Sequence, residues 1–193
     1  MKIAIVKYNA GNTLSVQIAL QRLEMNSEVT ADPKKIRTAD KVIFPGQGEA
    51  SSALESLKEN GLIEVLQELK KPLLGICLGQ QLLATNSEEN NAGGLGIVDC
   101  TIKKFPAQKK VPHIGWNTIN HLKGPLFTDV PDCSYVYFVH SYYMQIIDCK
   151  TATTDYIIPF SSAVQKDNFY AVQFHPEKSG DIGSKILKNF LIL

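Results

Sequence analysis

The sequence lacks the features that mark several large classes of protein. Its four cysteines stand singly with no C-x-x-C pair, which excludes a zinc knuckle and a disulfide framework and predicts free thiols. Lys and Arg number 20 against 19 Asp and Glu, without a block of like charge, so the charge pattern favours neither nucleic acid nor membrane as a partner. No apolar run is long enough to span a membrane, and Lys7 interrupts the first apolar run too early for a signal peptide. We therefore expect a cytoplasmic protein with a small-molecule substrate.

The composition is that of an ordinary globular protein. Of the 193 residues, 44 % are hydrophobic and 20 % are charged, which is enough apolar material for one sizeable core. No internal repeat, low-complexity tract or linker divides the chain. We expect one domain over residues 1–193, with no synthase or nucleotide-binding domain fused to it.

Strand-like and helix-like patterns alternate through the first half of the chain. Short β-rich runs occur at 3–6, 28–31, 41–44 and 73–76, and helical spacing of apolar residues occurs at 14–23, 50–59 and 62–69. The run that begins at Lys41 is expected to stop at Pro45. Beyond residue 94 the pattern becomes largely β, with runs at 98–104, 113–119, 135–139, 151–154, 162–165 and 170–174, before a closing helix at 182–193. The order predicts an α/β fold with a mixed, mostly parallel central sheet, flanking helices and a smaller antiparallel β portion in the second half.

The segment Gly75-Ile76-Cys77-Leu78-Gly79 places a cysteine between two glycines, where a strand ends and a helix over 80–84 is expected to begin. This spacing is typical of a nucleophile elbow, in which a tight turn projects the side chain above the sheet and small neighbours avoid clashes. The N–H groups and dipole of the following helix would also stabilise a thiolate. The alternative is a buried core cysteine, which is the common fate of a lone Cys. The glycine frame favours the nucleophile at Cys77 and leaves the other cysteines as structural.

A thiol nucleophile needs a base, and one of the four histidines has a partner built into the sequence. His175-Pro176-Glu177 follows an apolar strand, and a carboxylate bonded to one ring nitrogen would fix the tautomer and raise the basicity of the other. The alternative is a turn that caps the last helix and leaves the carboxylate in solvent. His113, His121 and His140 lie in or beside strands or in a polar turn, and a structural or solvated role fits each better.

Acyl transfer to a thiol also creates an oxyanion, which needs N–H donors aimed at it. The amide that follows the nucleophile, at Leu78, is one source. The turn over 45–48 (PGQG) is another, because glycine lacks a Cβ and lets backbone N–H groups approach a ligand closely. The alternative is that residues 45–48 form an ordinary strand-to-helix turn with no role in catalysis.

These motifs resemble the class I, triad-type glutamine amidotransferases, which have Gly-x-Cys-x-Gly-x-Gln and a late His-Pro-Glu. Here they are residues 75–81 and 175–177, in the same order. Within the family the chain is similar to the glutaminase subunits of imidazole glycerol phosphate synthase, through stretches at 8–12, 111–117, 137–142 and 173–179. The resemblance runs essentially end to end and implies a flavodoxin-like fold and release of ammonia from glutamine by Cys77, His175 and Glu177.

The resemblance also implies roles for individual positions. Those expected to hold the amino-acid end of glutamine are Gln81, Ser141 and Tyr142. Those expected to form the oxyanion site are Leu78, Gly46, Gln47 and Gly48. Those expected to face a synthase partner are Asn12, Trp116, Asn117, Tyr137 and Lys178. One departure is position 47, which is Gln where the family has a small apolar residue, usually valine.

The implied partner is the cyclase subunit of that synthase, in a heterodimer, and the resemblance implies neither a cofactor nor a metal. Two alternatives stay open on the sequence. One is the glutaminase subunit of another synthase, such as those of anthranilate, aminodeoxychorismate or pyridoxal phosphate synthesis, which the stretches at 111–117 and 175–179 argue against. The other is a non-catalytic module on the same fold, since fold alone does not fix function. An α/β-hydrolase fits less well, because the acidic residue here follows the histidine.

Overall fold

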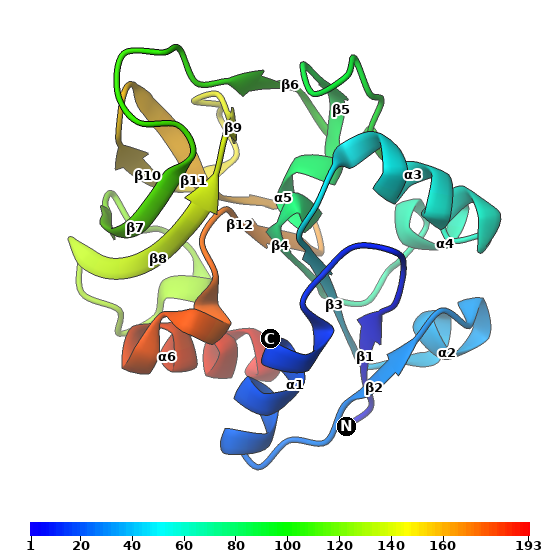
Figure 1. Cartoon of the computed structure of the whole chain (residues 1–193). Coiled ribbons are helices and arrows are strands. Elements are labelled where there is room, and N and C mark those ends of the chain that lie inside the picture. Colours follow the sequence, from blue (N-terminus) through cyan, green and yellow to red (C-terminus); the bar gives the residue numbers. More distant parts are fainter.

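The centre of the protein is a seven-stranded mixed sheet (Figure 1). The structure is a computed structural model that describes residues 1–193. The strands of the sheet are β1 (Ile3–Val6), β2 (Glu28–Thr30), β3 (Lys41–Gly46), β4 (Leu73–Cys77), β10 (Lys150–Asp155), β11 (Pro159–Lys166) and β12 (Phe169–Val172). They lie in the order β10-β11-β12-β4-β3-β1-β2. The five from β12 to β2 run parallel, and β11 and β10 continue the sheet antiparallel beyond β12.

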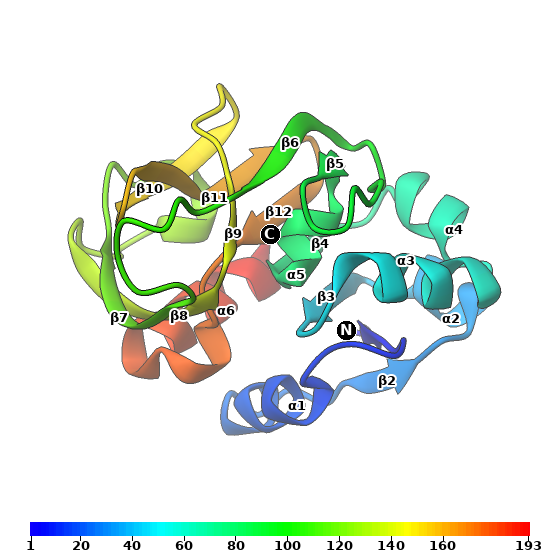
Figure 2. The ribbon, with the colours of Figure 1, turned by 45° about the horizontal axis from the view of Figure 1, so that its top comes forward.

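Helices cover both faces of this sheet (Figure 2). They are α1 (Thr13–Arg22), α2 (Pro33–Thr38), α3 (Ala50–Glu59), α4 (Ile63–Gln67), α5 (Leu78–Leu82) and α6 (Gly180–Ile192). Successive side chains of a strand point to opposite faces, so the central strands supply two cores. Ile43 of β3 packs in one cluster with Leu20 of α1 and Phe190 of α6. Its neighbour Phe44 packs in the other cluster with Leu57 of α3.

Two smaller sheets are built from strands between residues 84 and 144. One joins β5 (Ala84–Ser87), β6 (Val98–Lys104) and β9 (Tyr142–Met144); the other joins β7 (His113–Ile119) and β8 (Ser134–His140). The pairs β6·β9 and β7·β8 are antiparallel, whereas β5 and β6 run parallel. Two short 3-10 turns, η1 (Pro125–Phe127) and η2 (Pro176–Lys178), complete the elements. The predicted fold class is confirmed.

Several local predictions were wrong. Strand β3 does not stop at Pro45 but continues to Gly46, and this last part of the strand pairs only with β4. Pairing with β1 ends at Ile43, and the missing N–H of Pro45 falls on this unpaired side of the strand, since the Val42 N–H faces β4 and N–H groups alternate between the two sides. Helix α5 begins at Leu78 rather than at residue 80, and Ala84 already belongs to β5. The short elements α2, β5 and β9 have too few residues to show a period in the sequence.

The four cysteines are free thiols, as the sequence predicts. None of the helices combines the length and the apolar character that crossing a membrane would require.

Candidate active site

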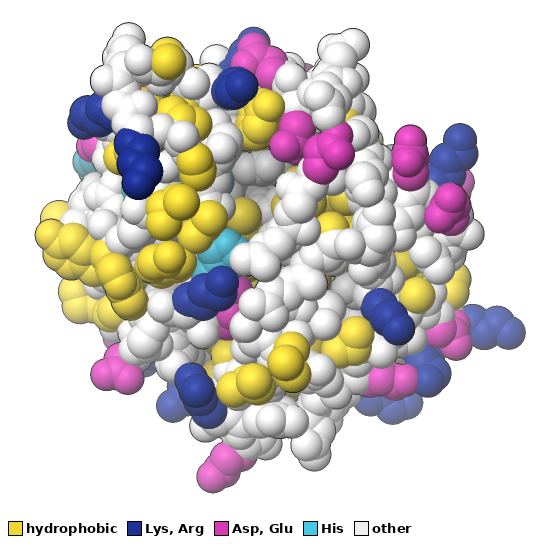
Figure 3. Space-filling model, in the orientation of Figure 1, with side chains coloured by type: hydrophobic (Ala, Val, Ile, Leu, Met, Phe, Trp, Pro, Cys, Tyr) yellow, Lys and Arg dark blue, Asp and Glu magenta, His cyan; other side chains and the backbone are white.

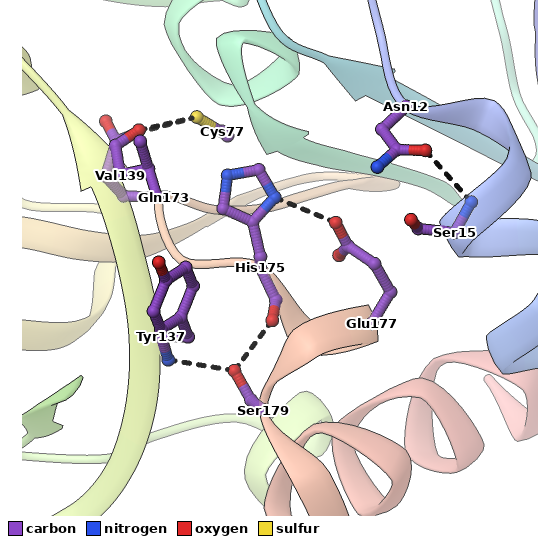
Figure 4. Close-up of polar contacts among 9 residues, drawn as sticks. All are labelled: Asn12, Ser15, Cys77, Tyr137, Val139, Gln173, His175, Glu177 and Ser179. Atoms are coloured by element: carbon purple, nitrogen blue, oxygen red, sulfur yellow. Dashed lines mark hydrogen bonds and ion pairs between the residues drawn. The ribbon is translucent and has the colours of Figure 1, made fainter. Parts of the chain in front are cut away.

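The motif residues meet at one edge of the central sheet. Strands β3, β4 and β12 are parallel neighbours, and their registers align Gly46 with Cys77 and Val172 with Ile76. The carboxyl ends of parallel strands lie at the same edge, where open α/β sheets bind their ligands. Two segments 98 residues apart in the sequence therefore deliver Cys77 and His175 to one place (Figure 4).

Cys77 occupies a strained turn directly between β4 and α5. Its backbone has φ +54° and ψ −107°, a conformation that costs a non-glycine residue on the order of 1–3 kcal/mol. The flanking glycines make the turn possible: a Cβ on Gly75 would lie 2.9 Å from the carbonyl oxygen of Gly79, and one on Gly79 would lie 2.0 Å from that of Phe44. The predicted nucleophile-elbow geometry is therefore present.

The side chains of His175 and Glu177 form a buried pair. His175 Nδ1 lies 2.8 Å from Glu177 Oε1, and each side chain is only 2 % exposed. The reading of Glu177 as a solvated carboxylate was wrong, because η2 folds it under the imidazole. The second ring nitrogen, Nε2, is buried and has no hydrogen-bond partner. Figure 4 shows the ring between the Cys77 sulfur and the Glu177 carboxylate.

This pairing sets the charge of the imidazole. Burial alone lowers the pKa of His175, but interaction with the side chains of Cys77 and Glu177 outweighs burial and raises the pKa from 6.5 to about 10. The ring is therefore an imidazolium across the neutral range, next to a sulfur that can carry negative charge. A cationic imidazole beside a cysteine sulfur is the usual setting of an activated cysteine.

Other groups around the sulfur hold it in place. Cys77 Sγ lies 3.6 Å from the Val139 carbonyl oxygen, to which the thiol can donate, and Gln173 Nε2 donates to Sγ at 3.6 Å. Gln173 in turn accepts a hydrogen bond from Gln81 Nε2 at 3.0 Å, and the same nitrogen donates to the Tyr142 carbonyl at 2.9 Å. The amide of Gln81 is thus tied both to Gln173, which contacts the Cys77 sulfur, and to β9, the strand that follows β8.

A cavity of about 380 Å³ opens above the sulfur. Its lining residues are Gln47, Gly48, Cys77, Leu78, Gln81, Glu89, Pro112, Val139, His140, Ser141 and Tyr142. The volume falls in the range of small-molecule sites. All the residues expected to contact glutamine line it except Gly46. That glycine lies beneath the wall, where a Cβ would come within 2.5 Å of Leu78 Cβ.

Comparison with known protein families gives the same family that the motifs around Cys77 and His175 indicate. Residues 4–193 match the family described as glutamine amidotransferase class-I. The chain belongs to this family.

Relatives of this amidotransferase carry a narrower name. The chain is 54 % identical to the imidazole glycerol phosphate synthase subunit HisH of Bacteroides fragilis, with 100 % of both chains covered. It is 45 % identical to the protein of the same name from Yersinia pestis, with 99 % of each covered. The predicted resemblance to this group within the family is confirmed.

Solved structures with lower identity share the amidotransferase fold. A putative GMP synthase protein of Thermoplasma acidophilum matches with a TM-score of 0.76 at 20 % identity, over 99 % of this chain and 92 % of that one. PurLQS of Thermotoga maritima matches with a TM-score of 0.74 at 16 % identity, over 99 % and 97 %.

The structure adds residues to the amidotransferase site that sequence reasoning missed. Glu89 contributes the only carboxylate in the cavity wall, and its Oε2 accepts a hydrogen bond from the Ala50 N–H at 2.8 Å. Burial is the main cause of a raised pKa for Glu89. The pair Glu88-Glu89 shows no periodicity or motif, so its position at the cavity could only come from tertiary structure.

His140 also lines the cavity, although the sequence favoured a structural or solvated role. Burial lowers the pKa of His140 to about 3 and that of His113 to about 4, so both rings stay neutral. His140 Nδ1 lies 2.8 Å from the Tyr142 carbonyl oxygen and donates to it, which leaves Nε2 to accept from His113 Nδ1 at 3.0 Å. These bonds make His140 a support for the strand that carries Tyr142.

The residues expected at a partner interface have different surroundings. Trp116 is 55 % exposed and lies edge-on to Tyr137, with 5.9 Å between ring centroids. Asn12 caps α1 by accepting a hydrogen bond from the Ser15 N–H at 3.1 Å. The side chain of Asn117 already has partners inside the protein, including the Asp155 carbonyl at 3.0 Å.

No cluster of three or more His, Cys, Asp or Glu side chains is arranged to hold a metal ion.

Proposed function

We propose that this amidotransferase is the cytoplasmic glutaminase subunit of imidazole glycerol phosphate synthase, which hydrolyses glutamine and passes the ammonia to a cyclase subunit in a heterodimer. The observation that carries the chemistry is the order of three side chains: Cys77 lines the cavity, the His175 ring lies beside its sulfur, and Glu177 is bonded to Nδ1 of that ring (Figure 4). The name of the relatives supports the assignment to histidine biosynthesis.

The reaction begins with attack of the Cys77 thiolate on the γ-carboxamide carbon of glutamine. The imidazolium of His175 gives its proton to the departing nitrogen, and ammonia leaves the γ-glutamyl thioester. The neutral ring then takes a proton from water, which attacks the thioester and releases glutamate and the thiolate. Glu177 holds Nδ1 throughout, so that Nε2 faces the reacting atoms.

The cavity walls supply the remaining contacts. The backbone N–H of Leu78 and those of the turn Gly46–Gly48 stabilise the oxyanion. Gln81 and the Ser141-Tyr142 pair orient the amino-acid end of the substrate. Glu89 has the charge that the α-ammonium group of glutamine needs, and it lies in the wall of the same cavity.

The exposed surface near this site suits a protein partner. Figure 3 shows hydrophobic side chains gathered over β7 and β8, with a second group over α1. Trp116, Ile114 and Tyr135 are 55 %, 52 % and 61 % exposed, and Leu14 of α1 is 64 % exposed. Exposed apolar patches that polar residues border commonly mark interfaces, and Asn12 and Lys178 supply polar groups near these two patches.

The proposed interface has a short connection to the catalytic histidine. The Tyr137 carbonyl of β8 accepts a hydrogen bond from the His175 N–H at 2.9 Å, and Ser179 Oγ accepts one from the Tyr137 N–H at 3.0 Å. Ser179 Oγ also donates to the His175 carbonyl at 2.7 Å. A partner that packs on β8 would therefore act on the backbone of His175, and we propose that docking raises glutaminase activity.

The test is glutamate release by the purified chain, alone and with the cyclase partner and its ribonucleotide ligand. We expect a higher rate with the partner, and at least a thousandfold loss, an order-of-magnitude figure, in Cys77→Ala. Cys133→Ala, which changes an exposed cysteine, is the matched control and should keep the wild-type rate. Equal rates with and without partner would refute the coupling, and substantial activity in Cys77→Ala would refute the nucleophile.

A further inference from the structure

The segment after β1 lies against the turn that follows β3. The two strands are parallel neighbours, so the chain leaves both at the same sheet edge. Tyr8 Oη donates to the Pro45 carbonyl at 2.6 Å, and the Gly11 N–H donates to the Gln47 carbonyl at 3.2 Å. We propose that Tyr8 is a positioning residue for catalysis, whose hydroxyl holds the Gly46–Gly48 turn in register with the nucleophile. This inference rests on the proposed glutaminase function.

The two hydrogen bonds constrain the turn from both sides. In a trans peptide the C=O and N–H groups point in opposite directions. Because the Pro45 carbonyl points toward Tyr8, the Gly46 N–H of the same peptide points away from Tyr8. In the same way, the Gln47 carbonyl points toward Gly11, so the Gly48 N–H points away from Gly11. The Gly46–Gln47 peptide lies between these two fixed peptides, and both Gln47 and Gly48 line the cavity with Cys77.

Tyr8 also sets the distance between the turn and the elbow. A Cβ on Gly46 would lie 2.8 Å from Tyr8 Oη and 2.5 Å from Leu78 Cβ, so the Gly46 backbone is held between the hydroxyl and the residue after the nucleophile. The Tyr8 ring packs against Phe44 of β3, with 5.4 Å between centroids. The hydroxyl thus reaches the turn from a ring that the sheet already fixes.

The surroundings keep this hydroxyl a donor. Burial and, to a smaller extent, the nearby Cys77 raise the pKa of Tyr8 above its ordinary value of 10. The O–H proton therefore stays in place over the working pH range, which a bond to a carbonyl oxygen requires.

A second set of contacts ties the same segment to the helix beyond the turn. Asn9 Nδ2 donates to the carbonyl and the Oγ of Ser52 at 3.1 and 2.7 Å, and the Asn9 N–H donates to Ser56 Oγ at 3.1 Å. Both serines belong to α3. The segment thus holds the turn and the start of the element that follows it.

Removing the hydroxyl should affect the transition state more than substrate binding. The groups proposed to bind the amino-acid end of glutamine belong to other segments, so glutamine should bind the variant normally. The oxyanion forms only after attack, and its donors act only if the turn is in place. The expected signature is a fall in kcat without a rise in KM.

The test compares Tyr8→Phe with Tyr156→Phe, using glutamate release in the presence of the cyclase partner. Tyr156 Oη also donates to a backbone carbonyl at 2.6 Å, that of Lys110, so the control removes the same kind of bond elsewhere. We expect kcat of Tyr8→Phe to fall by about ten- to a hundredfold with KM unchanged within about twofold. Tyr156→Phe should leave both constants within about twofold of wild type.

Alkylation of Cys77 by iodoacetamide separates positioning from general damage. This reaction forms no oxyanion, so Tyr8→Phe should be alkylated at the wild-type rate within about twofold. An unchanged kcat, a KM that rises as kcat falls, or a parallel loss of alkylation would each overturn the proposal. If the wild-type enzyme releases no glutamate, the proposed function fails; if it is active and Tyr8→Phe matches it, only the role of Tyr8 fails.

Discussion

The cavity has two walls that the chain builds in different ways. The elbow wall, Cys77–Gly79, is fixed by packing: a single methyl group on Gly79 would collide with the backbone of β3. The turn wall, formed by Gln47 and Gly48, is exposed, and two hydrogen bonds hold it: one from Tyr8 to the Pro45 carbonyl and one from the Gly11 N–H to the Gln47 carbonyl. The wall that carries Cys77 is held by packing, whereas the wall proposed to serve the oxyanion depends on hydrogen bonds that can be exchanged.

The largest expected effect comes from breaking the packed wall with Gly79→Ala. Helix propensity alone would favour alanine by about 1 kcal/mol, but the new Cβ would lie 2.0 Å from the Phe44 carbonyl oxygen. We expect urea denaturation to show a loss of about 3 kcal/mol in the free energy of unfolding. Glutamate release should fall by at least about a hundredfold, because the nucleophile is displaced.

Gly93→Ala is the matched control for that substitution. A Cβ on Gly93 would have no neighbour within 4 Å, and its φ is not positive. Its stability should stay within about 1 kcal/mol of wild type. Equal stability of the two variants would show that packing against β3 does not fix the elbow.

Glu177→Gln should have an intermediate effect, because it leaves the elbow intact and removes the charge that faces the imidazole. Glu177 is one of the groups that raise the pKa of His175, so that pKa should fall from about 10. Glutamate release should fall by about a hundredfold. Histidine-selective NMR measures the pKa shift, with the exposed Glu59→Gln as control; an unshifted His175 midpoint would contradict the pairing.

The sign of the stability effect follows from the raised pKa. Between pH 6.5 and about 10 the folded state holds a proton that the unfolded state has lost, so wild-type stability from this group is complete below pH 6.5 and is lost as pH rises toward 10. In Glu177→Gln this loss should occur at lower pH.

The smallest expected effect is that of Gln47→Val, which tests the turn wall. The Gln47 carbonyl is bonded to the Gly11 N–H, and its exposed side chain makes no hydrogen bond within the protein. Kinetic constants should change by less than about threefold, and unfolding free energy by less than about 0.5 kcal/mol. A change of tenfold or more in glutamate release would show that the side chain controls the turn.

The sequence predicts the central strands and the motif residues, but not every strand end or every residue that lies at the cavity. The apolar β runs and helical periods predicted the central strands, because buried parallel strands are strongly apolar. The stop at Pro45 was wrong because proline's missing N–H matters only where a neighbouring strand pairs with it. Glu89 and Tyr8 could not be assigned, since each reaches the site through contacts between segments far apart in the sequence. The catalytic and partner-facing roles remain predictions for the experiments above.

The position of β12 beside β4 has a consequence during synthesis of the enzyme on the ribosome. Cys77 leaves the peptidyl-transferase centre 98 residues before His175, and the strand that delivers His175 is inserted beside β4 in the middle of the sheet. At about 5–20 residues per second, roughly 5–20 s of translation separate the two. During that interval the nascent chain carries the cysteine without its imidazolium. Under the proposed mechanism, the thiol therefore becomes fully reactive only when synthesis has reached the end of the sheet.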